Sequence, residues 1–139
     1  MGRMQREKGA RFEREVAGMF RDYGYEASRT AQHCGKTGQV ADVKGVPGIS
    51  IECKAQEKMH LYDWMDQAVR DSEAQGEGRI PVVIHKQNYK DVLVTMRFSD
   101  WIQMYNEWEA GNVQMGERVL PKTTTAATKA GEEARNTEV

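Results

Sequence analysis

Residues 49–55 read Ile-Ser-Ile-Glu-Cys-Lys-Ala. Apolar and polar residues alternate in this stretch with the two-residue period of a half-buried β-strand. Ile51 and Cys53 are expected to point to one face of the strand. Glu52 and Lys54 then share the opposite face, so the stretch predicts a carboxylate and an ammonium group two residues apart on a rigid element.

A second alternating run, residues 40–44, precedes the turn signal Gly-Val-Pro-Gly at residues 45–48. A three-residue loop is a common hairpin connection, and it would place Asp42 opposite Glu52 on the same face. A two-residue loop would instead place Asp42 opposite Ile51, because a slip of one residue moves every side chain to the other face. The alternation favours the three-residue loop.

Two carboxylates held this close repel each other unless a cation lies between them. Oxygen ligands without a converging His or Cys suit Mg²⁺, with Mn²⁺ as a substitute. An exposed hairpin with solvated charges fits the same residues, because an Asp followed by Glu-x-Lys is common by chance. His33 and Cys34 are adjacent in the sequence but have no partners at zinc-ligand spacing.

Length and composition limit the possible classes of protein. The 139 residues predict one domain over 1–112 and a disordered tail over 113–139, where the end of the chain is rich in Thr, Ala and Glu. No apolar run approaches a membrane span and the charged N-terminus lacks a signal-peptide core, so a cytoplasmic location is expected. Seven basic and five acidic residues give the first thirty positions a net charge of +2. This excess suits a phosphate-facing surface or a solvated helix face.

The first helix is predicted from Gln5 to Tyr23, and Gly24 is expected to end it. Its apolar residues recur at helical spacing and form one stripe: Phe12, Val16, Met19, Phe20 and Tyr23. Glu13 lies at the border of that stripe. It is expected either at the surface or near the hairpin, where it could help to hold a metal ion or its water.

The other elements follow from apolar periodicity, turn residues and caps. In chain order they are a strand at Tyr25–Arg29, an irregular loop at 30–39, a helix over Leu61–Ser72 that ends near Gly76, a buried strand at Ile80–His85, a strand at Val92–Phe98 and a helix capped by Ser99. His60 and His85 are interpreted as structural. The order predicts an α/β fold with a mixed central β-sheet of about five strands flanked by helices.

Five segments, in this order, resemble the archaeal-type Holliday junction resolvases of the PD-(D/E)XK nuclease superfamily. They are Lys-Gly-Ala-Arg-Phe-Glu-Arg-Glu at 8–15, Val-Ala-Asp at 40–42, Ile-Glu-Cys-Lys at 51–54, His-Leu-Tyr at 60–62 and Arg-Ile-Pro-Val-Val at 79–83. The Asp…Glu-x-Lys pattern occurs across the superfamily, whereas the first and fourth segments are more specific for the resolvases. Ala41 stands where the superfamily name expects Pro. The resemblance implies a restriction-endonuclease-like core.

The resemblance also implies the roles of individual residues. Asp42, Glu52 and the main-chain carbonyl of Cys53 would bind the metal ion, and Glu13 matches the carboxylate that the family's first helix brings near it. Lys54 matches the lysine that orients or deprotonates the attacking water and steadies the charged phosphorane. A Ser or Thr assists near the scissile phosphate in relatives, and Thr37 is the first candidate here, followed by Thr30 and Ser28.

The implied activity is metal-dependent hydrolysis of paired phosphodiester bonds in a four-way DNA junction by a homodimer, in a bacterium or a phage-infected host. The residues expected to contact DNA are Lys8, Arg11, Arg14, Arg29 and Lys36. Two alternatives remain open. The chain could be another PD-(D/E)XK enzyme, such as a nickase or a restriction-type nuclease, or a junction-binding protein without catalysis.

Overall fold

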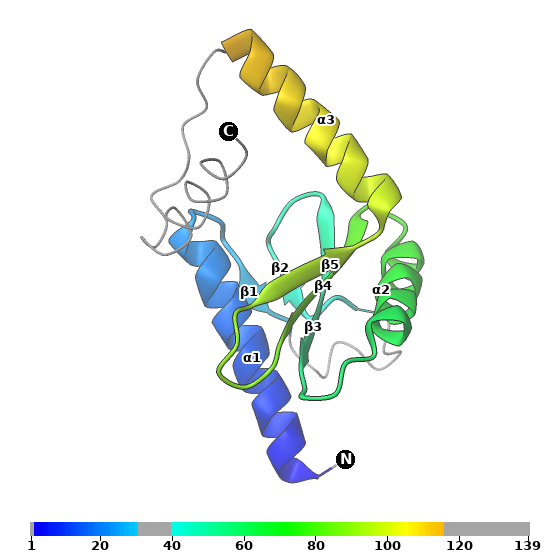
Figure 1. Cartoon of the computed structure of the whole chain (residues 1–139). Helices are drawn as coiled ribbons and strands as arrows, with labels where there is room; N and C mark the ends of the chain where they lie inside the picture. The colour runs from blue at the N-terminus through cyan, green and yellow to red at the C-terminus, as the bar shows by residue number, and fades with distance from the viewer. Residues whose placement is uncertain (1, 31–39, 116–139) are drawn as a thin grey trace, which may run out of the picture. The chain divides into compact units, whose positions relative to one another are not determined.

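The computed structural model describes residues 2–30 and 40–115 of the chain. The elements, shown in Figure 1, are α1 (Arg3–Asp22), β1 (Ser28–Arg29), β2 (Val43–Lys44), β3 (Ile49–Ala55), α2 (Leu61–Gln75), β4 (Ile80–Lys86), β5 (Leu93–Met96) and α3 (Phe98–Met115). The chain divides into two compact units, Met1–Met104 and Tyr105–Val139. All five strands, α1 and α2 belong to the first unit. No helix within the described ranges is long and apolar enough to cross a membrane.

The five strands form one mixed sheet in the order β1-β2-β3-β4-β5, which confirms the predicted α/β class. β3 and β4 are parallel and pair along seven residues each, whereas the other neighbours are antiparallel. A parallel pair needs a crossover connection, and α2 provides it here. β3, which has seven residues like β4, is the central strand of the sheet.

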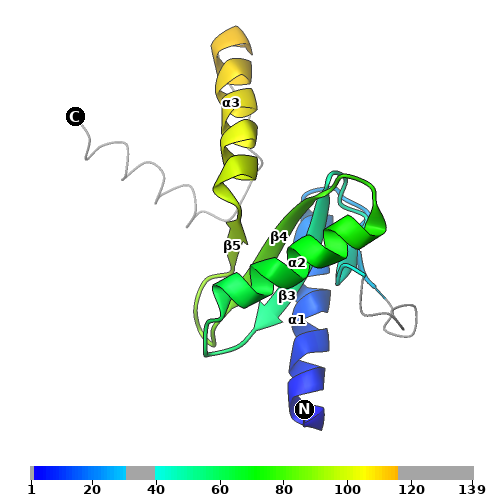
Figure 2. The ribbon, with the colours of Figure 1, turned by 90° about the vertical axis from the view of Figure 1, so that its right-hand side faces the viewer.

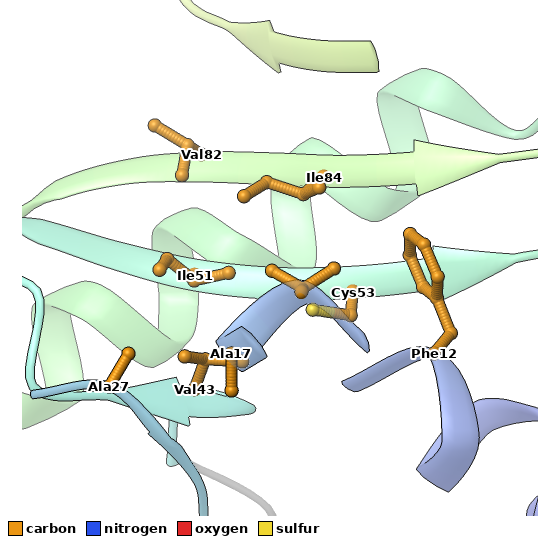
Figure 3. Close-up of a cluster of buried hydrophobic side chains, with 9 residues drawn as sticks. Phe12, Ala17, Ala27, Val43, Ile51, Cys53, Val82 and Ile84 are labelled. Carbon is orange, nitrogen blue, oxygen red and sulfur yellow. The ribbon is translucent and has the colours of Figure 1, made fainter. Parts of the chain in front are cut away.

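One face of the sheet packs against α1. The buried side chains of this core come from α1, the three strands β2 to β4 and the segment before β1. Figure 3 draws them and labels all but Val16: Phe12, Val16, Ala17, Ala27, Val43, Ile51, Cys53, Val82 and Ile84. Of the apolar stripe predicted for this helix, Phe12 and Val16 are buried and Phe20 packs against the core. The prediction is wrong for Met19 and Tyr23, which are exposed. The Cys53 side chain belongs to the core, on the face opposite Glu52.

The other face of the sheet is covered by α2, which lies in front of β3 and β4 in Figure 2 with α1 behind them. Trp64 and Ala68 of α2 pack on Val83 of β4. The expectation that β3 is half-buried is therefore wrong, since Ser50 and Glu52 are also buried. The cause is the parallel pairing with β4, because its crossover helix covers the polar side of β3.

Most predicted elements are present with modified ends. α1, β3, α2 and β4 match their predicted ranges within three residues, and α2 ends at Gly76 in the left-handed conformation. The predicted strands over 25–29, 40–44 and 92–98 are shortened to two, two and four residues. Ser99 does not cap the last helix, because α3 begins at Phe98. The main-chain carbonyl of Arg97 accepts the N–H of Asp100 instead.

Candidate active site

The hairpin of β2 and β3 brings Asp42 to Glu52. Val43 pairs with Ile51, which is the register that the three-residue loop predicts. Asp42 lies just before β2, and its main-chain N–H donates to the carbonyl of Ile51 at 2.8 Å. Its Oδ2 accepts the N–H of Cys53 at 2.8 Å, and its carboxyl group shares a hydrogen bond with that of Glu52. The two acids therefore meet at a fixed place on the main chain.

Burial dominates the electrostatics of this pair. It raises the pKa of Asp42 to about 6, although the N–H of Cys53 acts in the opposite direction. It raises the pKa of Glu52 to about 8, and the charge of Asp42 adds to the effect. The fold therefore holds two acids together although ionisation of both is unfavourable. A site with this property favours the binding of a cation.

Lys54 lies beside these acids on the same face of β3. Its Nζ is 3.5 Å from Oε1 of Glu52 and donates a hydrogen bond of 3.2 Å to Oε1 of Gln67 on α2. The side chain of Lys54 is only 20% exposed. These two contacts fix a long, flexible side chain, so the ammonium group is held next to the carboxylates.

Glu13 is buried on α1, not at its surface, and its charge acts on Asp42. Its Oε2 accepts a hydrogen bond from Nε of Arg29 on β1 at 2.5 Å. The structure thus brings Glu13 close to the pair of acids but gives it a cationic partner. Arg29, which the sequence analysis assigns to DNA contact, is engaged in this ion pair.

Sequence reasoning misses two residues of α2 that contact the site. Gln67 accepts the hydrogen bond from Lys54, and Asp71 shares a hydrogen bond with Glu52. Burial raises the pKa of Asp71. The signal lies in their spacing, because residues four apart share one face of a helix. Only the crossover geometry shows that this face covers Glu52 and Lys54.

The other predicted site residues divide into two groups. Arg11 and Arg14 are exposed on α1, and Lys8 is partly exposed on the same helix. Lys36 and Thr37 lie outside the described residues, as do His33 and Cys34. The basic residues of α1 are therefore accessible to a phosphate backbone, whereas the position of the assisting hydroxyl stays a prediction.

The two histidines predicted to be structural both contact Trp64. The ring of His85 is 5.9 Å from that of Trp64, and its Nε2 forms a hydrogen bond of 2.8 Å with Oγ1 of Thr95. Burial lowers the pKa of His85. His60 precedes α2, and its ring is 6.4 Å from that of Trp64. Both positions lie at the packing of α2 on the sheet.

The donor chemistry of the site fits Mg²⁺. Asp42 and Glu52 offer hard oxygen ligands in a buried place where negative charge is unfavourable without a cation. Within the described parts of the chain, no three His, Cys, Asp or Glu side chains form a complete metal cage. Mg²⁺ does not need such a cage, since it keeps several waters and is usually bound by one or two carboxylates together with substrate phosphates.

A comparison with known protein families agrees with this chemistry. Residues 4–133 match the family described as "Phage putative PDDEXK endonuclease". Among solved structures, Hjc of Archaeoglobus fulgidus, a Holliday junction resolvase from an archaeal hyperthermophile, is similar at 25% sequence identity and a TM-score of 0.49. The similarity covers 68% of this chain and 76% of that one. No curated protein matches. Because the family match spans most of the chain and the site carries its Asp…Glu-x-Lys residues, this protein belongs to the phage PD-(D/E)XK endonuclease family.

Proposed function

We propose that this protein is a Mg²⁺-dependent, structure-selective DNA endonuclease that acts as a homodimer and resolves four-way junctions. The nuclease activity is inferred from one observation: the carboxyl groups of Asp42 and Glu52 lie together beside the ammonium group of Lys54. The family match supports an endonuclease. The choice of a junction as substrate is supported by the sequence resemblance to the resolvases, above all at residues 8–15 and 60–62.

Asp42, Glu52 and the main-chain carbonyl of Cys53 are the groups proposed to hold Mg²⁺. When bound, a divalent cation there neutralises phosphate charge and lowers the pKa of a bound water. The main-chain N–H of Cys53 holds the Asp42 carboxylate in place. Because both acids belong to one hairpin, their side chains are positioned before the substrate binds.

Lys54 is proposed to orient the attacking water and to donate hydrogen bonds to the phosphate oxygens. During hydrolysis the water oxygen gives up a proton and forms a new bond to phosphorus, the P–O ester bond to the leaving strand breaks, and the leaving oxygen takes up a proton, so that one water is added across the ester bond. Charge accumulates on the phosphate oxygens in this step, so a fixed ammonium group stabilises it. The contact with Gln67 limits how far Lys54 can move.

Selectivity for a junction is proposed to depend on DNA shape and on contacts to the phosphate backbone. Arg11 and Arg14 are exposed on the helix that carries Glu13, so they are available for such contacts. A four-way junction has near two-fold symmetry, and two copies of this chain related by a two-fold axis would offer one site to each of two opposite strands.

The test is cleavage of a synthetic immobile four-way junction, compared with a duplex and a single strand of matched sequence, each with and without Mg²⁺. We expect paired, symmetric nicks in the junction only when Mg²⁺ is present. Cutting of the duplex at a fixed sequence would instead identify a restriction-type enzyme, and nicking of one strand a nickase. Junction binding without metal-dependent cutting would favour the non-catalytic alternative.

Two variants connect this activity to the site. Glu52→Gln and Asp42→Asn keep the shape of the side chains but remove their charge, and each is expected to lower cleavage at least about 100-fold, as loss of a transition-state contact does. Their affinity for the junction, measured by fluorescence anisotropy in Ca²⁺, should stay within about threefold. Undiminished turnover in either variant would contradict the metal assignment.

A further inference from the structure

Three polar side chains of α2 face three polar side chains of β3 in matching order. Nζ of Lys54 donates to Oε1 of Gln67 at 3.2 Å, and Nε2 of Gln75 donates to Oγ of Ser50 at 3.5 Å. Between these two contacts, Asp71 shares a hydrogen bond with Glu52. The helix positions are four apart and the strand positions are two apart. These spacings correspond to about 6 Å along a helix and about 6.6 Å along a strand, so the two rows stay in step and α2 runs antiparallel to β3.

The middle contact differs from the outer two because it places an acid against an acid. The outer contacts use an uncharged amide, which satisfies its partner without adding charge. Asp71 is only 5% exposed and Glu52 only 4%. Two acids in such a place repel each other unless a proton or a cation is shared with them. A Gln or Asn at position 71 would avoid that repulsion, so stability of the fold does not explain the aspartate.

The Oδ2 atom of Asp71 gives a second, independent indication. It is buried, and among the described residues it has no hydrogen-bond partner. A buried acceptor without a donor is unfavourable, and natural proteins contain few of them. The charges of Arg70 and Lys54 act on Asp71, but Arg70 is exposed to solvent and Lys54 already contacts Glu52 and Gln67. The negative charge at this place is therefore only partly compensated by the protein itself.

We propose that Asp71 is a positioning residue of the divalent-cation site. From α2 it orients the carboxylate of Glu52, and its negative charge strengthens Glu52 as a metal ligand. Carboxylates that contact a metal ligand in this way commonly change metal affinity 10- to 100-fold when they are removed. The inference rests on the proposed function, because it takes Glu52 to be a ligand. Gln67 and Gln75 hold α2 in register on either side, so the position of Asp71 is fixed by the helix as a whole.

The test measures Mn²⁺ binding directly, by the loss of the electron paramagnetic resonance signal of free Mn²⁺ on titration of the full chain. Asp71→Asn keeps the shape of the side chain and removes its charge. We expect its dissociation constant for Mn²⁺ to rise about 10-fold. Asp66→Asn is the matched control, since Asp66 is exposed on the same helix, and its dissociation constant should stay within about twofold of the wild-type value.

Two further readouts separate this role from a merely structural one. The melting temperature of metal-free Asp71→Asn at pH 8 should equal or exceed that of the wild type, because the variant removes a repulsion between acids. In the junction assay, the variant should need about 10-fold more Mg²⁺ for half-maximal cleavage, while its turnover at saturating Mg²⁺ stays within about threefold of wild type. A purely structural Asp71 would instead lower the melting temperature and leave the Mg²⁺ requirement unchanged.

The outcomes distinguish this inference from the proposed function. If Asp71→Asn binds Mn²⁺ as tightly as the wild type while Glu52→Gln has lost binding, the role of Asp71 is refuted and the cation site stands. If the variant binds one ion fewer and the remaining ion as tightly as before, Asp71 is a direct ligand and the positioning role is refuted. If the wild type binds no Mn²⁺, the proposed function fails together with this inference.

Discussion

At the scale of the residue, the central feature is an acid on a buried strand face. Glu52 contacts Asp42, Lys54 and Asp71, and it is 4% exposed. Such a group is costly to ionise, and the raised pKa values of Asp42 and Glu52 express that cost. A divalent cation would remove it. The same arrangement that suits metal binding therefore destabilises the metal-free fold at neutral pH.

The pH dependence of stability follows from this cost. The folded state raises the pKa of Glu52 from 4.5 to about 8, so the stability that depends on its protonated form is fully present below about pH 4.5 and is lost as the pH rises toward about 8. We expect metal-free Glu52→Gln to melt above the wild type at pH 8. A difference of about 5 °C would correspond to about 1 kcal/mol.

Calorimetry in EDTA at pH 5 and pH 8 measures this effect, and the advantage of Glu52→Gln should grow between the two. Glu26→Gln serves as a control, because the Glu26 side chain is exposed and the variant should melt like the wild type at both values. An advantage that shrinks as the pH rises would contradict the expected sign.

At the scale of the element, the β2–β3 hairpin determines where the acids meet. Its turn contains two glycines at positive φ, Gly45 at 91° and Gly48 at 83°. A Cβ atom on Gly45 would lie 2.1 Å from the carbonyl oxygen of Glu26, whereas one on Gly48 would meet no atom within 4 Å. Gly45 is therefore required by both its conformation and the close approach of the preceding chain.

The two glycines provide a matched pair of variants. Gly48→Ala is expected to cost about 1 kcal/mol, since an alanine in the left-handed region is strained. Gly45→Ala adds a main-chain clash and should cost about 3 kcal/mol or more in the free energy of unfolding. Urea denaturation measures both. Equal losses would show that the chain before β1 does not approach the turn as described.

The hairpin also shows what the sequence could and could not predict. The alternation from Ile49 to Ala55 gave the exact strand and the correct separation of its two faces, because that pattern is local. It did not give the burial of the polar face, which depends on the parallel pairing with β4 and on the crossover helix. Asp42 and Glu52 were found together because a turn joins their strands. Asp71 was missed because its contact with Glu52 depends on how α2 lies across the sheet.

At the scale of the whole molecule, a chain of net charge −1 is proposed to bind a large, highly charged substrate. The attraction to DNA must then come from basic residues grouped at one place, since the net charge of the chain does not supply it. Arg11 and Arg14 are exposed on α1, the helix that also carries Glu13. Contacts to phosphates release counterions, so affinity for DNA should fall as the salt concentration rises.

We expect Arg11→Ala and Arg14→Ala each to weaken junction binding and to reduce the slope of log affinity against log salt by about 1. Anisotropy titrations between about 50 and about 200 mM salt measure the slope. Arg79→Ala is the control, because Nη2 of Arg79 lies 2.6 Å from Oε2 of Glu77. Slopes unchanged in both α1 variants would remove these residues from the DNA surface.

The proposed resolution of junctions also requires two copies of the chain. Sedimentation at micromolar protein concentration is expected to give twice the 15.8 kDa of one chain. Paired cuts in opposite strands would then come from one complex, and a mixture of active and Glu52→Gln protomers should yield junctions nicked on one side only. A stable monomer under these conditions would argue against symmetric resolution.

The thiol of Cys53 lies in the core between two residues of the site, and burial raises its pKa. Such a thiol is protected from alkylating reagents for as long as the strand keeps its neighbours. The rate at which such a reagent labels Cys53, measured by peptide mapping, therefore reports how often β3 opens. Any ligand that binds Glu52 and Asp42 together should lower this labelling rate, and the measurement needs no dye or tag on the protein.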